Sequence, residues 1–272
     1  YGIIFKRIDL DKNNIINANF QNVCSAQLCT TLQNQFNVRV STVEHLLAAL
    51  YITGIDNALI EISNSEVPIM DGSSKEFVET INRTGVKKLN KKRKYLKIIK
   101  KFELKEKEKV ISIEPNENSL KVDFQLVYSN EVIGTQSNQI NFADANLTEV
   151  YSSRTFCLFE DIEKIKKIGL AKGGSLDNAI VVKNNKIVNA KGLRNNKEFV
   201  NHKILDLAGD FLLSGYRILG SVKCTQGGHS LSNLFLRTIF EDSSNFTIIE
   251  QEETSTAKNY FKIPTNKLAV NA

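Results

Sequence analysis

The segment KKLNKKRKYLKIIKKFELKEKEK, residues 87–109, decides how the chain is divided into folded parts. It contains 12 lysines and arginines and 3 glutamates, so its local charge of +9 exceeds the net charge of +6 and the rest of the chain is slightly acidic. Such a block can bind a polyanion, but a like-charged run is more often a solvated linker or an exposed strand edge. We favour this second interpretation and place a domain boundary at residue 92.

Strand and helix patterns occur on both sides of this segment. Before it, the patterns predict strands at 1–8, 37–40 and 57–63 and helices at 42–52 and 73–83. After it, they predict strands at 110–113 and 120–128, a hairpin of 179–182 and 186–188, and helices at 161–167, 196–215 and 229–241. We therefore predict an α+β fold, a two-domain sandwich of residues 1–92 and 93–272 in which each domain is a β-sheet layered with α-helices.

Composition places the protein among soluble globular proteins. The 272 residues are 42% hydrophobic and 24% charged, which is close to the globular average. No apolar run approaches the ~20 residues needed to span a bilayer. No charged-then-apolar leader opens the sequence, so we expect a cytoplasmic protein whose four cysteines are reduced.

The chain has three histidines, and each has polar neighbours. In HKILDLAGD (202–210), His202, Asp206 and Asp210 are spaced four residues apart, so they share one face of a helix. An imidazole and a carboxylate one turn apart can bind Zn²⁺ if a third ligand comes from elsewhere. The spacing alone favours an ordinary His–Asp hydrogen bond on a solvated helix.

The second histidine follows a glutamate in STVEHLLAAL (41–50). Ser41 and Glu44 match a capping box, which gives Glu44 a structural role at a helix start. Alternatively, Glu44 lies beside a metal ligand, His45, where a general base must stand to deprotonate water. The third histidine, His229, opens a helix after two glycines and could be an imidazolium held by a carboxylate such as Asp210.

Six short motifs together resemble one enzyme family. They are STVEHLLAAL (41–50), PIMDGS (68–73), RTF (154–156), GGS (173–175), HKILDLAGD (202–210) and GHS (228–230). In order and type they are similar to those of UDP-3-O-acyl-N-acetylglucosamine deacetylases, the zinc amidases of lipid A biosynthesis. The motifs span nearly the whole chain, which makes the set far more specific than any member.

The resemblance implies an active site at the domain interface. His45, His202 and Asp206 would hold the metal, which we expect to be Zn²⁺, although Fe²⁺ would also accept these ligands. By the same resemblance, Glu44 would be the general base and His229 the charged catalytic histidine.

Further catalytic roles follow from the same motif matches. Asp210 would orient His229, Lys203 would be a positive neighbour that also binds substrate, and Thr155 would hydrogen-bond near the scissile acetamide. The proton for the departing amine would come from His229 or, alternatively, from Glu44. Cys157 and Gln226 depart from the family pattern, which leaves pocket shape and phosphate contacts less defined.

The implied substrate carries a sugar nucleotide and an acyl chain. Phe156 would line the nucleotide-sugar pocket, and residues 161–182 would supply an apolar passage with Ile162 and Leu176 as wall residues. Core packing is the alternative role for these apolar residues. Family chains begin earlier than Tyr1, so we expect the first sheet to lack strands.

The expected reaction is hydrolysis of the N-acetyl group of UDP-3-O-acyl-N-acetylglucosamine, with release of acetate, as the committed step of lipid A biosynthesis. We expect a monomer that acts on this small molecule and has neither a nucleic-acid partner nor an integral membrane contact. Two alternatives remain at this point. One is a metal-dependent deacetylase of another N-acyl sugar, and the other is a non-enzymatic protein that binds polyanions through Lys87–Lys109.

Overall fold

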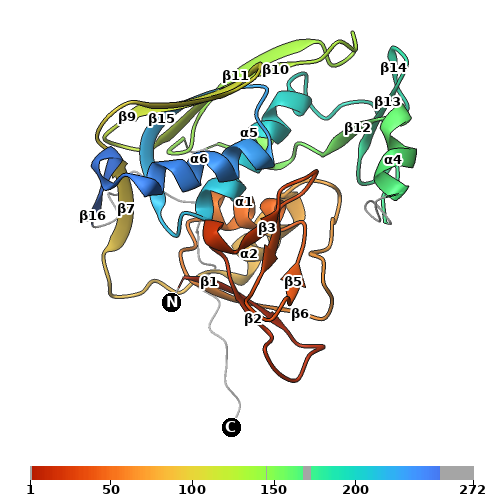
Figure 1. Cartoon of the computed structure of the whole chain (residues 1–272). Coiled ribbons are helices and arrows are strands. Elements are labelled where there is room, and N and C mark those ends of the chain that lie inside the picture. The colour runs from red at the N-terminus through yellow and green to blue at the C-terminus, as the bar shows by residue number, and fades with distance from the viewer. Residues whose placement is uncertain (1, 145, 168–172, 252–272) are drawn as a thin grey trace.

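The computed structural model describes residues 2–144, 146–167 and 173–251, and it has the α+β fold predicted from sequence (Figure 1). Three helices, α1 (Glu44–Ile52), α5 (Glu198–Leu212) and α6 (His229–Glu241), form the middle of the molecule. A large sheet covers them on one side and a smaller sheet lies on the other. No helix within the described residues is long and apolar enough to span a bilayer.

The strands before residue 92 form two three-stranded sheets. In the first, with order β2-β1-β6, strand β1 is antiparallel to β2 and parallel to β6, and the second is the antiparallel sheet β3-β4-β5. The bounds are β1 (Ile3–Arg7), β2 (Ile15–Asn17), β3 (Val23–Ser25), β4 (Thr31–Gln33), β5 (Arg39–Val40) and β6 (Ala58–Ile62). Helix α2 (Lys75–Thr84) and the 3-10 turn η1 (Phe20–Asn22) complete this part.

The large sheet is built around one strand that the sequence patterns did not predict. Strand β15 is parallel to β10 and β7 and antiparallel to β9, while β11, β16 and β8 extend the sheet. The bounds are β7 (Arg93–Ile98), β8 (Phe102–Glu106), β9 (Lys109–Pro115), β10 (Leu120–Val127), β11 (Thr135–Asn141), β15 (Arg217–Thr225) and β16 (Phe246–Gln251). Every second side chain of β10 is buried, as the alternating pattern predicted, and this strand packs against α5.

A fourth sheet, which is small, has the order β12-β13-β14 and lies at one end of the molecule (Figure 1). Strands β13 (Ile180–Lys183) and β14 (Lys186–Ile187) form the predicted hairpin, whose turn residue Asn184 has a φ of 51°. The remaining elements are α3 (Thr148–Tyr151), β12 (Phe156–Leu158), η2 (Phe159–Asp161), α4 (Ile162–Lys167) and η3 (Ser243–Asn245).

The basic segment forms both a linker and part of the large sheet. Residues 85–92 contain no helix or strand, which fits the predicted linker. The expectation of an exposed strand edge is met by β8, which pairs only with β9 among the described strands. It is wrong for β7, an interior strand between β15 and β16. The division into two domains at residue 92 stays a prediction, although every described strand pairs on its own side of that residue.

The close packing of α1 on α5 depends on one glycine. A Cβ added at Gly209 would lie 2.1 Å from the carbonyl oxygen of Glu44 and 3.1 Å from the backbone nitrogen of Ala48. Real Cβ atoms do not approach so closely, so any other residue would push the two helices apart. Gly209 therefore sets the separation of the helices that carry the candidate site.

Candidate metal centre

Helices α1 and α5 bring the three predicted metal ligands together. His45 lies near the start of α1, and His202 and Asp206 lie one turn apart on α5. All three are buried, and one ligand atom from each lies within 4.8 Å of the others. The Oδ1 atom of Asp206 is 3.6 Å from Nε2 of His45 and 3.4 Å from Nε2 of His202.

This arrangement fits a metal ion of the size of Zn²⁺. Ligands about 2.0–2.2 Å from a tetrahedral zinc lie about 3.3–3.6 Å from one another, which matches both measured separations. Oδ1 of Asp206 is buried and has no hydrogen-bond partner among the described residues. Nδ1 of His202 contacts the backbone carbonyl of Ser153 at 3.0 Å, the outer contact that orients ligating histidines. An unpartnered carboxylate oxygen between two imidazoles is explained if a cation lies there.

Electrostatics keep His202 and Asp206 in the protonation states that bind metal. Burial lowers the pKa of His202 to about 3 despite the nearby Asp206, so its ring is neutral at physiological pH. Burial opposes ionisation of Asp206, but its contacts with His202 and Lys203 hold its pKa well below the ordinary value. The Nζ atom of Lys203 is 2.9 Å from Oδ2 of Asp206, and this pairing outweighs burial and raises the pKa of Lys203.

Glu44 faces the site instead of capping its own helix. Helix α1 begins at Glu44, two residues later than predicted, because Thr42 has a φ of 58° and is not helical. No side-chain hydrogen bond caps the helix, so the capping-box interpretation of Ser41 and Glu44 is wrong. Oε2 of Glu44 instead accepts the backbone N–H of Thr30 at 3.0 Å. Burial raises the pKa of Glu44, and His229 and His45 only partly offset that rise.

His229 and Asp210 form the pair that the sequence could not place. Nδ1 of His229 is 2.9 Å from Oδ2 of Asp210, and both residues are buried. The opposite ring nitrogen, Nε2, is 3.7 Å from Oε1 of Glu44 and 3.9 Å from Oδ2 of Asp206. Burial acts against the charged ring, but Asp210 and Glu44 outweigh it and raise the pKa of His229 to about 10. A charged imidazole beside a general base is equipped to protonate a leaving group.

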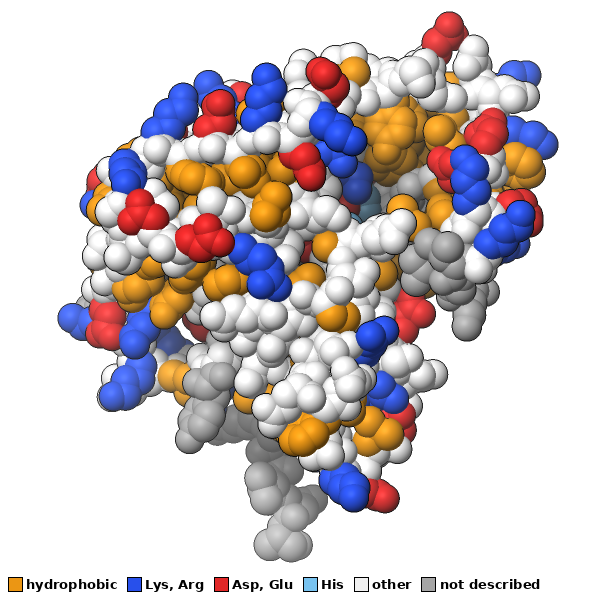
Figure 2. Space-filling view, viewed as in Figure 1, with side chains coloured by type: hydrophobic (Ala, Val, Ile, Leu, Met, Phe, Trp, Pro, Cys, Tyr) orange, Lys and Arg blue, Asp and Glu red, His pale blue; other side chains and the backbone are white. Residues whose placement is uncertain are grey.

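Phe156 and Lys203 lie at the edge of this cluster, and Thr155 directly precedes Phe156 in the chain. The Phe156 ring is 6.3 Å from the His202 ring, and Nζ of Lys203 lies 5.7 Å from the centre of the same phenyl ring. Thr155 is held by its backbone, which donates to the carbonyl of Gly72 at 2.7 Å. The space-filling view shows a hollow with apolar side chains along its edge and a histidine at its floor (Figure 2).

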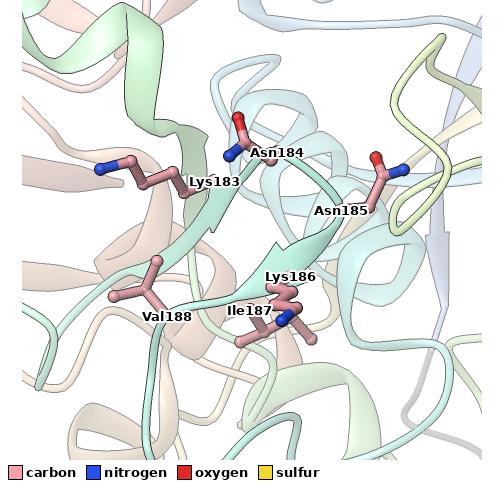
Figure 3. A pocket seen from close by; sticks show the side chains of 6 residues that line it. All are labelled: Lys183, Asn184, Asn185, Lys186, Ile187 and Val188. Carbon is pink, nitrogen blue, oxygen red and sulfur yellow. The ribbon is translucent and has the colours of Figure 1, made fainter.

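The predicted acyl passage, residues 161–182, includes the start of β13, where Ile180 pairs with Phe156 and donates its backbone N–H to the carbonyl of Thr155 at 2.8 Å. Ile162 begins α4 and is half-buried, Leu176 is 47% exposed, and residues 168–172 lie outside the described residues. A separate surface hollow is lined by residues 183–188 of the β13–β14 hairpin and includes none of the predicted site residues. Its side chains surround the turn rather than converging on one point (Figure 3).

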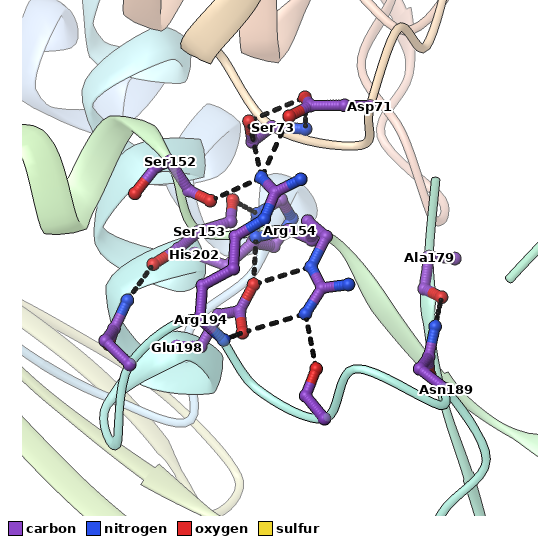
Figure 4. Close-up of polar contacts among 12 residues, drawn as sticks. Asp71, Ser73, Ser152, Ser153, Arg154, Ala179, Asn189, Arg194, Glu198 and His202 are labelled. Carbon is purple, nitrogen blue, oxygen red and sulfur yellow. Dashed lines mark hydrogen bonds and ion pairs between the residues drawn. The ribbon is translucent and has the colours of Figure 1, made fainter. Parts of the chain in front are cut away.

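A second buried polar cluster lies one turn before His202 and was missed from sequence (Figure 4). Glu198 is fully buried and accepts from Arg154 through both backbone N–H (3.1 Å) and Nε (2.8 Å). Its other oxygen accepts the backbone N–H of Arg194 at 2.6 Å, and the Arg194 side chain pairs with Asp71 at 2.8 Å. This cluster holds the backbone beside Ser153, whose carbonyl contacts His202.

Three residues that shape the site were not identified from sequence, although one of them carried a signal. In the sequence, Glu198 is only an acidic residue in the first turn of a helix, and such residues are common. Gly209 lies inside a helix, where glycine is intrinsically unfavourable. A glycine at such a position usually has a packing reason. Thr30 lies just before a short strand that the patterns did not predict.

Comparisons with known proteins agree with one another. The family model described as LpxC, UDP-3-O-acyl N-acetylglycosamine deacetylase, matches residues 1–241. The UDP-3-O-acyl-N-acetylglucosamine deacetylase of Idiomarina loihiensis is 39% identical over 272 residues, covering 98% of this chain and 89% of the relative. The proteins of the same name from Geobacter sp. strain M21 and Teredinibacter turnerae are 40% and 41% identical, over 92% and 93% of this chain and 81% and 85% of their own lengths.

Proposed function

The chain belongs to the UDP-3-O-acyl-N-acetylglucosamine deacetylase family, and we propose that it hydrolyses the N-acetyl amide of that substrate at the His45–His202–Asp206 centre. It is a hydrolytic enzyme of lipid A biosynthesis, and its reaction releases acetate and UDP-3-O-acyl-glucosamine.

One observation carries the assignment of the centre. Oδ1 of Asp206 is buried, lacks a hydrogen-bond partner among the described residues, and lies between two imidazole nitrogens at 3.4 and 3.6 Å. A buried carboxylate oxygen without a partner is costly unless a cation or a donor occupies the position it faces. Imidazole nitrogens together with a carboxylate oxygen suit Zn²⁺, which we propose as the metal. Fe²⁺ is the alternative.

The residues around the centre have the positions that amide hydrolysis needs. A bound zinc ion would lower the pKa of a water ligand to about 7 and polarise the substrate carbonyl. Glu44 takes the proton of the attacking water, and its raised pKa suits a base that must later release that proton. His229, kept charged by Asp210, donates a proton to the departing sugar amine. Lys203 and Thr155 hold the substrate near the acetamide.

The finer details of recognition follow from the same placement. Phe156 packs against Phe199 with ring centres 4.9 Å apart, so its ring offers a fixed apolar wall for the sugar nucleotide. Ile162 and Leu176 stay our candidates for the wall of the acyl passage. We also propose that the enzyme works as a monomer in the cytoplasm.

The polyanion-binding alternative has little left to support it. Four cations of the basic segment pair with carboxylates from outside it: Arg93 with Asp56, Lys94 with Glu250, Lys97 with Glu117 and Lys100 with Asp242. A paired cation offers less free charge to a phosphate backbone. The other alternative, deacetylation of a different N-acyl sugar, keeps the same centre and differs only in the pocket.

Metal analysis coupled to acetate release tests the proposal. The purified protein should hold about one zinc ion per chain and release acetate from UDP-3-O-acyl-N-acetylglucosamine, and His202→Ala should lose both the metal and the activity. Unacylated UDP-N-acetylglucosamine, offered at the same concentration, tests the sugar alternative. A His202→Ala protein that keeps its zinc and its turnover would overturn the assignment of the centre.

A further inference from the structure

All three polar groups of Thr30 are engaged at the site, although Thr30 lies 180 residues from Asp210 in sequence. The residue precedes β4 and is 2% exposed. Its backbone N–H donates to Oε2 of Glu44 at 3.0 Å, and its hydroxyl donates to Oδ1 of Asp210 at 2.7 Å. Its carbonyl accepts the N–H of Val43, the residue before Glu44, at 3.3 Å.

These contacts determine which oxygen each carboxylate presents to His229. Because the Thr30 hydroxyl occupies Oδ1 of Asp210, Oδ2 is left to contact Nδ1 of His229 at 2.9 Å. Because the Thr30 N–H occupies Oε2 of Glu44, Oε1 is left facing Nε2 of the same ring at 3.7 Å. A carboxylate held at one oxygen cannot rotate freely about its terminal bond. One threonine thus orients the partners on both sides of the imidazole.

We propose that Thr30 is a positioning residue for proton transfer, which acts through Asp210 and Glu44 and does not itself touch the reacting atoms. The inference rests on the proposed deacetylation at this centre. None of the contacts described for Thr30 involves His45, His202 or Asp206, so its role is separate from holding the metal. Its neighbour Thr31 turns away, with its hydroxyl donating to Ser41 at 3.1 Å.

A matched pair of variants isolates the hydroxyl. Thr30→Val keeps the size and the backbone N–H to Glu44 but removes the donor to Asp210, whereas Thr30→Ser keeps that donor. Thr30→Val should lower kcat about 10–100-fold, the usual effect of losing an outer hydrogen bond to a catalytic group, with KM changed less than about threefold. Both variants should keep about one zinc per chain, and Thr30→Ser should recover kcat to within about threefold of the wild type.

A spectroscopic measurement separates this inference from the proposed function. With only three histidines in the chain, the Nδ1–H resonance of His229 can be assigned in the zinc-loaded protein by its loss in His229→Gln. It should shift or broaden in Thr30→Val and stay in place in Thr30→Ser. If the wild type releases no acetate, the proposed function fails and this resonance alone decides the role of Thr30. An unchanged resonance in Thr30→Val, or a Thr30→Ser protein as slow as Thr30→Val, would overturn the inference.

Discussion

Two buried carboxylates on helix α5, about two turns apart, have opposite surroundings. Glu198 accepts from Arg154 and from the backbone of Arg194, so both of its oxygens are occupied. One oxygen of Asp206 pairs with Lys203. The other is buried and has no hydrogen-bond partner among the described residues. Both lie within the same well-packed helix, so packing does not distinguish them.

The difference shows how a structural cluster is told from a binding site. A buried charge whose hydrogen bonds are all made has nothing left to offer a ligand, and removing one partner leaves the other charge uncompensated. A buried charge with an open oxygen is stable only when something outside the chain occupies that position. Replacement of a carboxylate by an amide should therefore have opposite effects on stability in the metal centre and in the Glu198 cluster.

Glu44→Gln should give the largest effect, and it should fall on activity rather than on the fold. Loss of a general base typically costs about 10²–10⁴-fold in rate, and kcat should fall by that amount while the zinc content stays at about one per chain. Burial raises the pKa of Glu44, so the folded protein disfavours its charge. The neutral amide should therefore leave the free energy of unfolding of the metal-free protein unchanged or increase it.

Two measurements check this first prediction, namely steady-state acetate release and urea unfolding of the metal-free protein. Asp123→Asn is a suitable control because Asp123 contacts Gln139 on the exposed side of the large sheet. Full turnover by zinc-loaded Glu44→Gln would remove Glu44 from the mechanism.

Glu198→Gln is the same chemical change in the other cluster and should damage the fold. Breaking a buried ion pair at one partner costs about 3–5 kcal/mol because the remaining charge, here Arg154, stays buried without compensation. Urea unfolding of the metal-free protein should show this loss. Glu79→Gln is the matched control, because Glu79 pairs with Lys75 on the exposed face of α2 and such pairs contribute about 0.3–0.5 kcal/mol. Equal stability of the two variants would show that the Glu198 cluster is not structural.

The sequence predicted the fold class and some of its elements but missed the central strand of the large sheet. Helix α6 was predicted from His229 to Glu241 as observed, because glycines before it and strong amphipathic spacing mark both ends. Strand β15 was missed although it is central, because its buried residues share the segment RILGSVKCT with polar ones and a glycine. Gly220 in it approaches Ile113 closely, a packing reason that a single sequence does not display.

The same limit applies within the site. His45, His202 and Asp206 were assigned because the motifs that contain them resemble those of a zinc-enzyme family, and the chain has only three histidines to consider. Thr30 and Glu198 act through tertiary hydrogen bonds, and threonine and glutamate are too common for their position alone to indicate a role. Contacts between segments more than a hundred residues apart are fixed by the fold, so they become visible only with it.

Gly209→Ala should loosen the contact between α1 and α5 and so weaken the metal site. Alanine favours a helix over glycine by about 1 kcal/mol, which would stabilise α5 if nothing else changed. The new Cβ would lie 2.1 Å from the Glu44 carbonyl oxygen, and such overpacking typically costs about 1–3 kcal/mol. The net result should be a lower midpoint of thermal unfolding and weaker zinc binding. Gly173→Ala is the control, since a Cβ there meets nothing within 4 Å; an equal result for the two would mean that the helices adjust without cost.

A further effect should be a pH dependence of stability that comes from His229 in the metal-free protein. The pKa of His229 is raised from 6.5 to about 10 in the folded state, where Asp210 and Glu44 outweigh the effect of burial. A raised pKa means that the folded protein holds the proton more tightly, so the stabilisation is fully present below pH 6.5 and is lost as the pH rises through about 10. Denaturant unfolding of wild type and His229→Gln across this range measures it, and the difference in their free energies of unfolding should shrink steadily with rising pH. A constant difference would mean that the His229–Asp210 pair does not hold its proton.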